Sequence, residues 1–226
     1  MRKPALALVS ALFLAGCASA PSMKETETID HVILGIADLE AGIRSFADRT
    51  GATAEIGGQH PGRGTQNALA SLGSPTYLEI IAPVAGPPPG MEALSNLNEL
   101  MPVGWAIGTR DLDATKARLE AAGFKVSAPR PGSRVKPDGQ RLEWRTAGIE
   151  IPGGLTPFLI EWGAQTAHPS TTSPDGCTLE SMEIHSPQAK SLGKLVKELS
   201  LDAEVRIADA EKMIFTLQCP KGPVKF

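Results

Sequence analysis

One pattern of secondary-structure signals occurs three times along this chain, and it constrains the fold more than any other feature. It begins at Ile29 (IDHVILGIADLEAGIRSFADRTGATAEIGG), at Gly104 (GWAIGTRDLDATKARLEAAGFKVSAPRP) and, more loosely, at Leu179 (LESMEIHSPQAKSLGKLVKELSLDAEVRI). Each copy holds a short apolar strand, a helix of about three turns and a second strand. Asp38 and Asp111 stand at matching places, where each would cap the helix that follows. Such repetition indicates a duplicated supersecondary unit.

The segments after each copy define the fold class. Two further apolar strands follow the first copy (TQNALASL and TYLEIIAP), and two follow the second (GQRLEWRTAGIEI and TPFLIEWG). The chain therefore predicts an α+β fold with paired βαβββ modules at residues 29–83 and 103–165, which together make one domain over 29–165. Only one strand, MIFTLQCP, follows the third copy, so residues 177–226 predict a partial βαββ unit. The Pro-containing segment 166–176 predicts a linker.

The first residues carry targeting signals. A short basic start and an apolar run over residues 4–16, too short to span a bilayer, precede Leu14-Ala15-Gly16-Cys17, which resembles the bacterial lipobox. We therefore expect a signal peptide over 1–16, lipidation of Cys17, and a polar tether over 17–28 that links the chain to the membrane through its lipid anchor. Ala18 after the cysteine resembles the default for the outer membrane, so we expect the periplasmic face of the bacterial cell envelope. An ordinary signal peptide, cleaved near Ala18-Ser19-Ala20, is the alternative.

Charge and cysteine content narrow the class of protein. The chain has 22 basic and 25 acidic side chains, a formal net charge of -3 and 4% aromatic residues, which argues against nucleic acid as a partner. Without Cys17, two cysteines remain, Cys177 and Cys219. They could form a disulfide in an oxidising compartment or remain two separate, partly buried thiols, and the sequence leaves both open.

Strand alternation predicts which side chains share a cleft. His31 lies on one face of the first strand, and Tyr77 and Glu79 lie on the same face of the fourth. The large apolar side chains within 158–162 are expected to face the helix, which would turn Glu161 toward the cleft. One imidazole and two carboxylates would then converge on a concave surface. Buried carboxylates need a cation or hydrogen-bond donors, and a divalent metal ion would satisfy them.

This arrangement resembles the vicinal oxygen chelate superfamily, which includes glyoxalase I, extradiol dioxygenases and the bleomycin-resistance proteins. More narrowly, IDHVILGIADLEAG, GGQHPGRGTQNALASLG and TYLEIIAP resemble the glyoxalase-like domain family. The resemblance covers about residues 28–165 and implies a U-shaped sheet around a metal or ligand site. It implies metal ligands at His31, Glu79 and Glu161, with Glu79 or Glu161 also acting as the catalytic base. Gly104 stands where the family has a fourth ligand, so the ligand set is incomplete.

Other polar residues are candidates for substrate binding. His60, Arg63 and Asn67 lie in GGQHPGRGTQNA and, with Tyr77, could donate hydrogen bonds to a substrate oxygen, although the glycines could simply permit a tight strand connection. A cationic stretch follows later and predicts either a solvated strand edge or a positive rim for an anionic small molecule; it comprises Arg130, Arg134, Lys136, Arg141 and Arg145. His168 and His185 lie outside the two modules and are expected to be structural or surface residues.

These features lead to one leading hypothesis and two alternatives. We expect an envelope-anchored protein that binds a divalent metal ion (Zn, Ni, Fe or Mn) and a small oxygenated substrate, with lyase, isomerase or dioxygenase chemistry. The first alternative is a non-catalytic periplasmic binding protein of the bleomycin-resistance type, because the small residues Gly104, Ala106 and Gly108 would leave room for an apolar ligand. The second is an envelope interaction protein. Edge strands of the third unit would allow a homodimer.

Overall fold

Two βαβββ modules share one large sheet in the computed structural model, which describes residues 27–153 and 155–226. The first module comprises β1 (Thr28–Gly35), α1 (Leu39–Thr50), β2 (Glu55–His60), β3 (Thr65–Ser71) and β4 (Tyr77–Pro83). A 3-10 helix, η1 (Glu92–Asn96), lies in the connection to the second. The second module comprises β5 (Met101–Gly108), α2 (Leu112–Ala121), β6 (Lys125–Val126), β7 (Arg130–Val135), β8 (Arg141–Glu150) and β9 (Phe158–Trp162). Its β6 and β7 both pair with β8, so together they take the place of the single strand β2 in the first module. This α+β architecture confirms the predicted fold class.

Local sequence signals explain the helices of the modules. The side chain of Asp38 accepts a hydrogen bond from the Ala41 amide at 2.8 Å, and that of Asp111 accepts one from the Ala114 amide at 2.9 Å. Each bond satisfies an amide that has no partner within the first turn, which stabilises the helix start. The repeated aspartates therefore begin α1 and α2 at equivalent places in the two modules.

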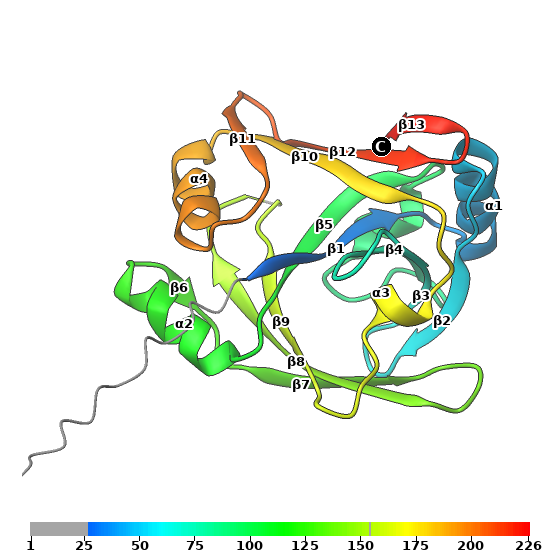
Figure 1. Ribbon diagram of the computed structural model, residues 1–226, viewed down its shortest axis with the longest axis horizontal. Helices are drawn as coiled ribbons and strands as arrows, with labels where there is room; N and C mark the ends of the chain where they lie inside the picture. The colour runs from blue at the N-terminus through cyan, green and yellow to red at the C-terminus, as the bar shows by residue number, and fades with distance from the viewer. Residues whose placement is uncertain (1–26, 154) are drawn as a thin grey trace, which may run out of the picture.

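The pairing of β1 with β5 joins the modules. The strands follow the order β2-β3-β4-β1-β5-β9-β8-β6, with β7 paired to β8 (Figure 1). Within the modules β1 pairs in parallel with β4, and β5 in parallel with β9, whereas β1 and β5 run antiparallel. The two duplicated halves are thus continuous at the centre of the sheet.

The cationic stretch forms a β-hairpin, with Arg130 and Arg134 in β7 and Arg141 and Arg145 in β8. Residues Arg130–Val135 form β7, which pairs antiparallel with β8. Its Arg134 side chain donates a hydrogen bond to the Gly57 carbonyl of β2, at the opposite end of the strand order. The far edges of the two modules therefore meet, and the curved sheet encloses a cavity.

The C-terminal unit forms its own sheet. It comprises β10 (Thr178–Ser186), α4 (Ala189–Glu198), β11 (Glu204–Ile207), β12 (Lys212–Cys219) and β13 (Gly222–Lys225), in the order β11-β10-β12-β13. The predicted βαββ unit therefore lacked one strand, β13. The topology also differs from the modules, because β10 pairs directly with β11 and β12. The segment predicted as a linker contains a short helix, α3 (Pro169–Thr172).

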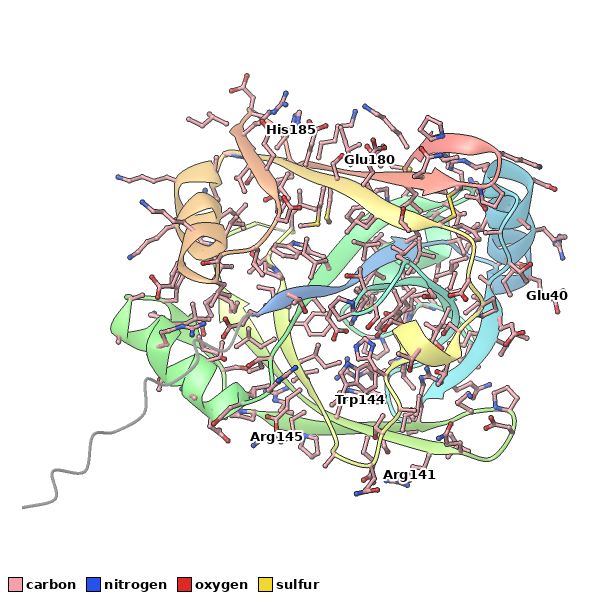
Figure 2. All side chains as sticks on the ribbon, in the orientation of Figure 1. Glu40, Arg141, Trp144, Arg145, Glu180 and His185 are labelled. Carbon is pink, nitrogen blue, oxygen red and sulfur yellow. A yellow bond between two sulfur atoms is a disulfide. The ribbon has the colours of Figure 1, made fainter. Side chains whose placement is uncertain are left out.

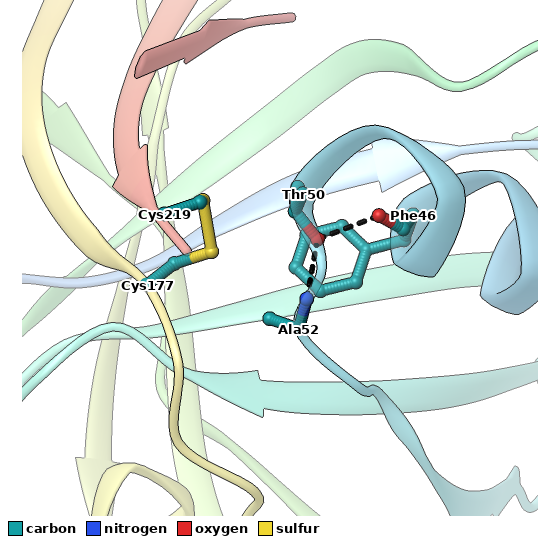
Figure 3. The surroundings of a disulfide bond; sticks show 5 residues. All are labelled: Phe46, Thr50, Ala52, Cys177 and Cys219. Atoms are coloured by element: carbon teal, nitrogen blue, oxygen red, sulfur yellow. Dashed lines mark hydrogen bonds between the residues drawn. A yellow bond between two sulfur atoms is a disulfide. The ribbon is translucent and has the colours of Figure 1, made fainter. Parts of the chain in front are cut away.

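A shared hydrophobic core holds this unit on the modules, and a disulfide forms within the unit. Buried side chains of all three units form a single cluster, which includes Phe46, Trp105 and Phe215. Cys177 and Cys219 form a disulfide beside the end of α1, where Thr50 donates a hydrogen bond to the Phe46 carbonyl at 2.6 Å (Figure 3). The first of the two alternatives for these cysteines is therefore the one that the structure shows.

Within residues 27–153 and 155–226, no helix is both long and apolar enough to cross a membrane. The expected signal peptide, the lipidation site Cys17 and most of the expected tether lie outside the described residues.

Candidate functional site

A β-bulge in β1 builds the centre of the candidate site. Ile29 pairs with Ile107 and His31 pairs with Ala106 of β5, so Asp30 is an extra residue between two successive pairs. A bulge places two neighbouring side chains on one side of a strand, where regular alternation would separate them. The Asp30 carboxylate consequently reaches the ring of the next residue, with 2.7 Å between Asp30 Oδ1 and His31 Nδ1. Gly108 makes room for it, because a Cβ there would lie 2.9 Å from Asp30 Oδ2.

Three donors hold the buried Asp30 carboxylate. Besides His31, Trp162 Nε1 donates to Asp30 Oδ2 at 3.0 Å, and His168 Nε2 lies 3.0 Å from the same oxygen. The Ser170 amide donates to His168 Nδ1 at 3.2 Å, so the ring hydrogen of neutral His168 sits on Nε2 and points at Asp30. Burial opposes ionisation, but the hydrogen bonds from His168 and His31 outweigh it and hold the pKa of Asp30 below its ordinary value.

His31 presents its second nitrogen to Glu79. Ionised Asp30 can only accept a hydrogen bond from His31 Nδ1. The neutral form of the His31 ring therefore carries its hydrogen on Nδ1 and has a lone pair on Nε2. That atom lies 3.8 Å from Glu79 Oε2. The ring is buried and stacks on Tyr77, with 4.6 Å between ring centroids. Burial, together with the charges of Asp30 and Glu79, raises the pKa of Tyr77 well above its ordinary value, so its hydroxyl stays protonated.

Asn67 and His60 hold Glu79 from the other side. Asn67 Nδ2 donates to Glu79 Oε1 at 2.7 Å and lies 3.3 Å from His60 Nε2. His60 Nδ1 lies 2.9 Å from the Thr65 hydroxyl, across the β2–β3 hairpin that GGQHPGRGTQNA forms. Burial lowers the pKa of His60, and the nearby Glu79 charge does not offset this effect. His60 is therefore a neutral ring that accepts from Asn67.

Glu161 lies on the opposite face of the sheet, which corrects the sequence prediction. Its Oε2 accepts a hydrogen bond from the Leu112 amide at the start of α2, at 3.0 Å, and another from Arg145 Nη2 at 2.5 Å. In β9, Phe158 pairs with Ala106 and Leu159 with Ile107, so Phe158 shares the face of the small β5 residues. The large side chains fill the space that those residues leave. Pairing with β5 therefore determines which face each β9 side chain occupies, and the prediction from the hydrophobicity of β9 alone was wrong.

The cavity has a polar floor and an aromatic wall. It has a volume of about 310 Å³, and its lining includes His31, Glu79, His60, Asn67 and Tyr77. The aromatic side chains of Phe158, Trp144 and Trp162 also line it. These fill part of the space that Gly104 and Ala106 were expected to leave open. The sequence predicted His31, Glu79, His60, Asn67 and Tyr77 as site residues, and the structure brings these five together.

An outer groove adjoins this cavity. His60, Arg63, Trp144 and Trp162 line both, and the groove has a volume of about 620 Å³. Arg141 and Arg145 lie along it on β8, and Trp144 stands between them in the sequence (Figure 2). Both arginines already have carboxylate partners, since Arg141 pairs with Glu143 and Arg145 with Glu161. Of the predicted cationic stretch, Arg134 is the member whose side chain is buried at the inner cavity.

The residues present do not fit a three-ligand metal site. Among the described residues, no group of three or more His, Cys, Asp or Glu side chains could hold a metal ion. Glu161, the expected third ligand, faces away, and Asn67 Nδ2 lies between Glu79 Oε1 and His60 Nε2. A metal ion needs lone pairs at such a point, whereas an amide nitrogen offers hydrogens.

Comparison with known proteins agrees with this architecture. The sequence profile of the glyoxalase-like domain family matches residues 29–200. The chain belongs to the glyoxalase-like domain family. The match runs beyond the two modules into α4, so this glyoxalase-like domain includes part of the C-terminal unit. No curated protein matches the sequence.

Solved structures align with this chain at low sequence identity. A hypothetical protein from Staphylococcus aureus aligns with a TM-score of 0.68 and 14% identity, covering 88% of this chain and 98% of its own. Methylmalonyl-CoA epimerase from Mycobacterium tuberculosis aligns with a TM-score of 0.48 and 23% identity, covering 61% of this chain and 89% of its own. The first alignment extends over most of the described residues of the glyoxalase-like chain. At 14% identity it shows a shared fold and nothing about function.

Replacing the buried carboxylate should destabilise the protein in a pH-dependent manner. In Asp30→Asn, one amide oxygen cannot accept from three donors, so we expect the free energy of unfolding at neutral pH to fall by about 1–3 kcal/mol. Because the pKa of Asp30 is lowered in the folded state, its contribution is fully present above the unfolded-state pKa. This contribution is lost as the pH falls through the folded-state pKa of Asp30. The difference in unfolding free energy between the unmodified protein and Asp30→Asn should therefore become smaller at low pH.

Chemical denaturation at a series of pH values measures this difference. The exposed Asp175 on the segment before β10 provides a matched control, and Asp175→Asn should behave as the unmodified protein does. Equal unfolding free energies for Asp30→Asn and Asp175→Asn at neutral pH would contradict the proposed carboxylate network.

Proposed function

We propose that this glyoxalase-like protein is an enzyme that moves a proton on a small oxygenated substrate held in the inner cavity. The observation that carries the proposal is the Asp30–His31–Glu79 arrangement at the cavity floor, in which one imidazole lies between two buried carboxylates. A base that takes a proton from carbon needs a lone pair held in position, here on His31. It also needs nearby negative charge that stabilises its protonated form, here from the two carboxylates. A cavity of about 310 Å³ suits a small organic molecule.

His31 Nε2 is the base in this proposal. It takes a proton from a carbon next to a substrate carbonyl, the C–H bond breaks, and its electron pair moves onto the carbonyl oxygen as an enolate. The imidazolium that forms has Asp30 at Nδ1 and Glu79 beside Nε2, so both carboxylates stabilise its charge. Return of the proton from Nε2 to a neighbouring atom of the enolate, on the same face, gives the isomer. Glu79 is therefore a stabilising group, and Asn67 orients it.

The aromatic wall supports a second candidate function. Trp144 and Trp162 lie with their ring centroids 5.5 Å apart beside the cavity, and Phe158 contacts the His31 ring edge-on at 5.6 Å. Such a wall would hold an apolar or aromatic ligand without any reaction, as in the bleomycin-resistance alternative. This function needs the cavity but not the lone pair of His31, and the two candidates therefore differ in what a substitution of His31 does.

Removing the base separates these candidates. We expect His31→Asn to slow the exchange of solvent deuterium into the acidic C–H of small 2-oxo compounds by about 10²- to 10⁴-fold, followed by NMR. His185 lies in the C-terminal unit beside Glu183, so His185→Asn is a matched control that should retain the full rate. Equal rates for the two variants, or no exchange with the unmodified protein, would favour the binding function.

Metal analysis tests the metal-dependent version that the resemblance implies. With no three-ligand group among the described residues, we expect less than about a tenth of an equivalent of Zn, Ni, Fe or Mn after incubation with each salt and desalting. A full equivalent of one metal, lost together with activity on chelation, would instead support the metal-dependent lyase or dioxygenase hypothesis.

We also propose that the protein acts at the cell envelope, anchored through Cys17. The lipobox-like LAGC sequence and the Cys177–Cys219 disulfide, which suits an oxidising compartment, support this location. In a Gram-negative host, Cys17→Ala should lose labelling by an alkyne palmitate analogue and leave the membrane fraction. Ser19→Ala, which leaves LAGC intact, is the matched control. Labelling of the Cys17→Ala protein at the level of the control would contradict the anchor.

A further inference from the structure

A buried arginine lies in the wall of the inner cavity. Arg134 is 3% exposed, and among the described residues no Asp or Glu oxygen lies within ion-pair distance of its guanidinium. One nitrogen, Nη1, donates to the Gly57 carbonyl. A guanidinium carries five N–H donors and keeps its charge in proteins, so most of its binding capacity remains unused by this one carbonyl.

The local sequence brings this charge to the cavity at a structural cost. Arg134 is the buried residue of β7, in a strand whose neighbouring Val135 is 53% exposed. Gly57 allows the approach, because a Cβ there would lie 3.3 Å from Arg134 Cζ and 2.4 Å from Asn67 Oδ1. Burial lowers the pKa of Arg134, and the charge of the Glu79 carboxylate opposes this effect. A buried, unpaired cation is destabilising, which indicates that an anion completes this site.

The carboxylate of the cavity is already engaged. Glu79 Oε1 accepts from Asn67, and the two Glu79 oxygens lie 3.6 Å from His60 Nε2 and 3.8 Å from His31 Nε2. Glu79 acts on Arg134 only through longer-range charge attraction and forms no ion pair with it. The cavity contains a cation free to bind a ligand and, on its floor, the imidazole and carboxylate described above.

We propose that Arg134 recognises the carboxylate of a small organic acid, and that such acids are the substrate class of this cavity. That these acids are substrates rests on the proposed function, whereas their binding by Arg134 does not. A carboxylate matches the planar fork of a guanidinium and gives charge-assisted hydrogen bonds. The remainder of the molecule would lie against the aromatic side chains of Trp144, Trp162 and Phe158, which line the same cavity. The substrate is therefore a compact acid with an apolar group, of a size that about 310 Å³ can hold.

Matched pairs of probes test the recognition directly. Phenylpyruvate, phenylacetate and 2-oxobutyrate would each be compared with its neutral methyl ester, with binding followed by tryptophan fluorescence and confirmed by calorimetry on the full chain. We expect the best acid to bind about ten- to a hundredfold more tightly than its ester. Arg134→Gln should remove this preference, and Arg134→Lys, which keeps the charge but loses the fork, should retain part of it.

Arg130 provides the control on the same strand. It is exposed and does not line the cavity, so Arg130→Gln should keep the full preference for the acid. Near-ultraviolet circular dichroism would show that each variant is folded. If Arg134→Gln does not fold, the ratio of acid to ester affinity, compared between the unmodified protein and Arg134→Lys, still tests the proposal. Failure of every acid to bind more tightly than its ester, or an unchanged preference in folded Arg134→Gln, would overturn the proposal.

The same probes distinguish this inference from the proposed function. His31→Asn should keep the preference for acids while losing deuterium exchange, because Arg134 alone reads the charge. If the unmodified protein prefers acids but exchanges no deuterium, the proton-transfer function fails and the recognition of acids stands.

Discussion

Where β1 pairs antiparallel with β5, Asp30 is an extra residue of β1, and the candidate site depends on it. Without the bulge at Asp30, alternation would turn this carboxylate to the core while His31 faced the cavity. With it, Asp30 lies beside the imidazole and gathers donors from β9 and from the segment before α3. The same strand pair joins the two modules, so the feature that builds the fold also orients the proposed base.

Closure of the sheet is the second constraint. The β7–β8 hairpin bridges from the end of one module to β2 of the other, where Arg134 reaches the Gly57 carbonyl. This contact turns an open, curved sheet into a cavity and buries a positive charge in its wall. Exclusion of water strengthens each electrostatic interaction inside, which makes a small number of polar side chains sufficient for chemistry. The shared core fixes the C-terminal unit on the modules outside this cavity, and the disulfide stabilises that unit internally.

Much of this arrangement could be predicted from the sequence, because duplication and alternation are strong signals. The helix caps, the two modules and the cavity positions of His31, Tyr77 and Glu79 follow from them. Asp30 could not be found in this way, since a bulge depends on pairing between strands far apart in the chain. Glu161 was assigned to the wrong face because the small side chains of β5 required large neighbours, and this requirement appears only once β5 and β9 are known to pair. The buried position of Arg134 was not predicted either, because the sequence does not distinguish an arginine on an exposed strand edge from one in a cavity wall.

The most direct test of the central claim is the protonation state of the two His31 ring nitrogens. Long-range proton–nitrogen NMR correlation on histidine labelled with ¹⁵N reports this state for each ring, and His31→Asn assigns the signal. In mildly alkaline solution, the account predicts a hydrogen on Nδ1, where Asp30 accepts it, and a lone pair on Nε2, with the Nδ1 signal displaced in Asp30→Asn. A hydrogen on Nε2 instead, or a spectrum unchanged by the loss of the Asp30 carboxylate, would contradict it.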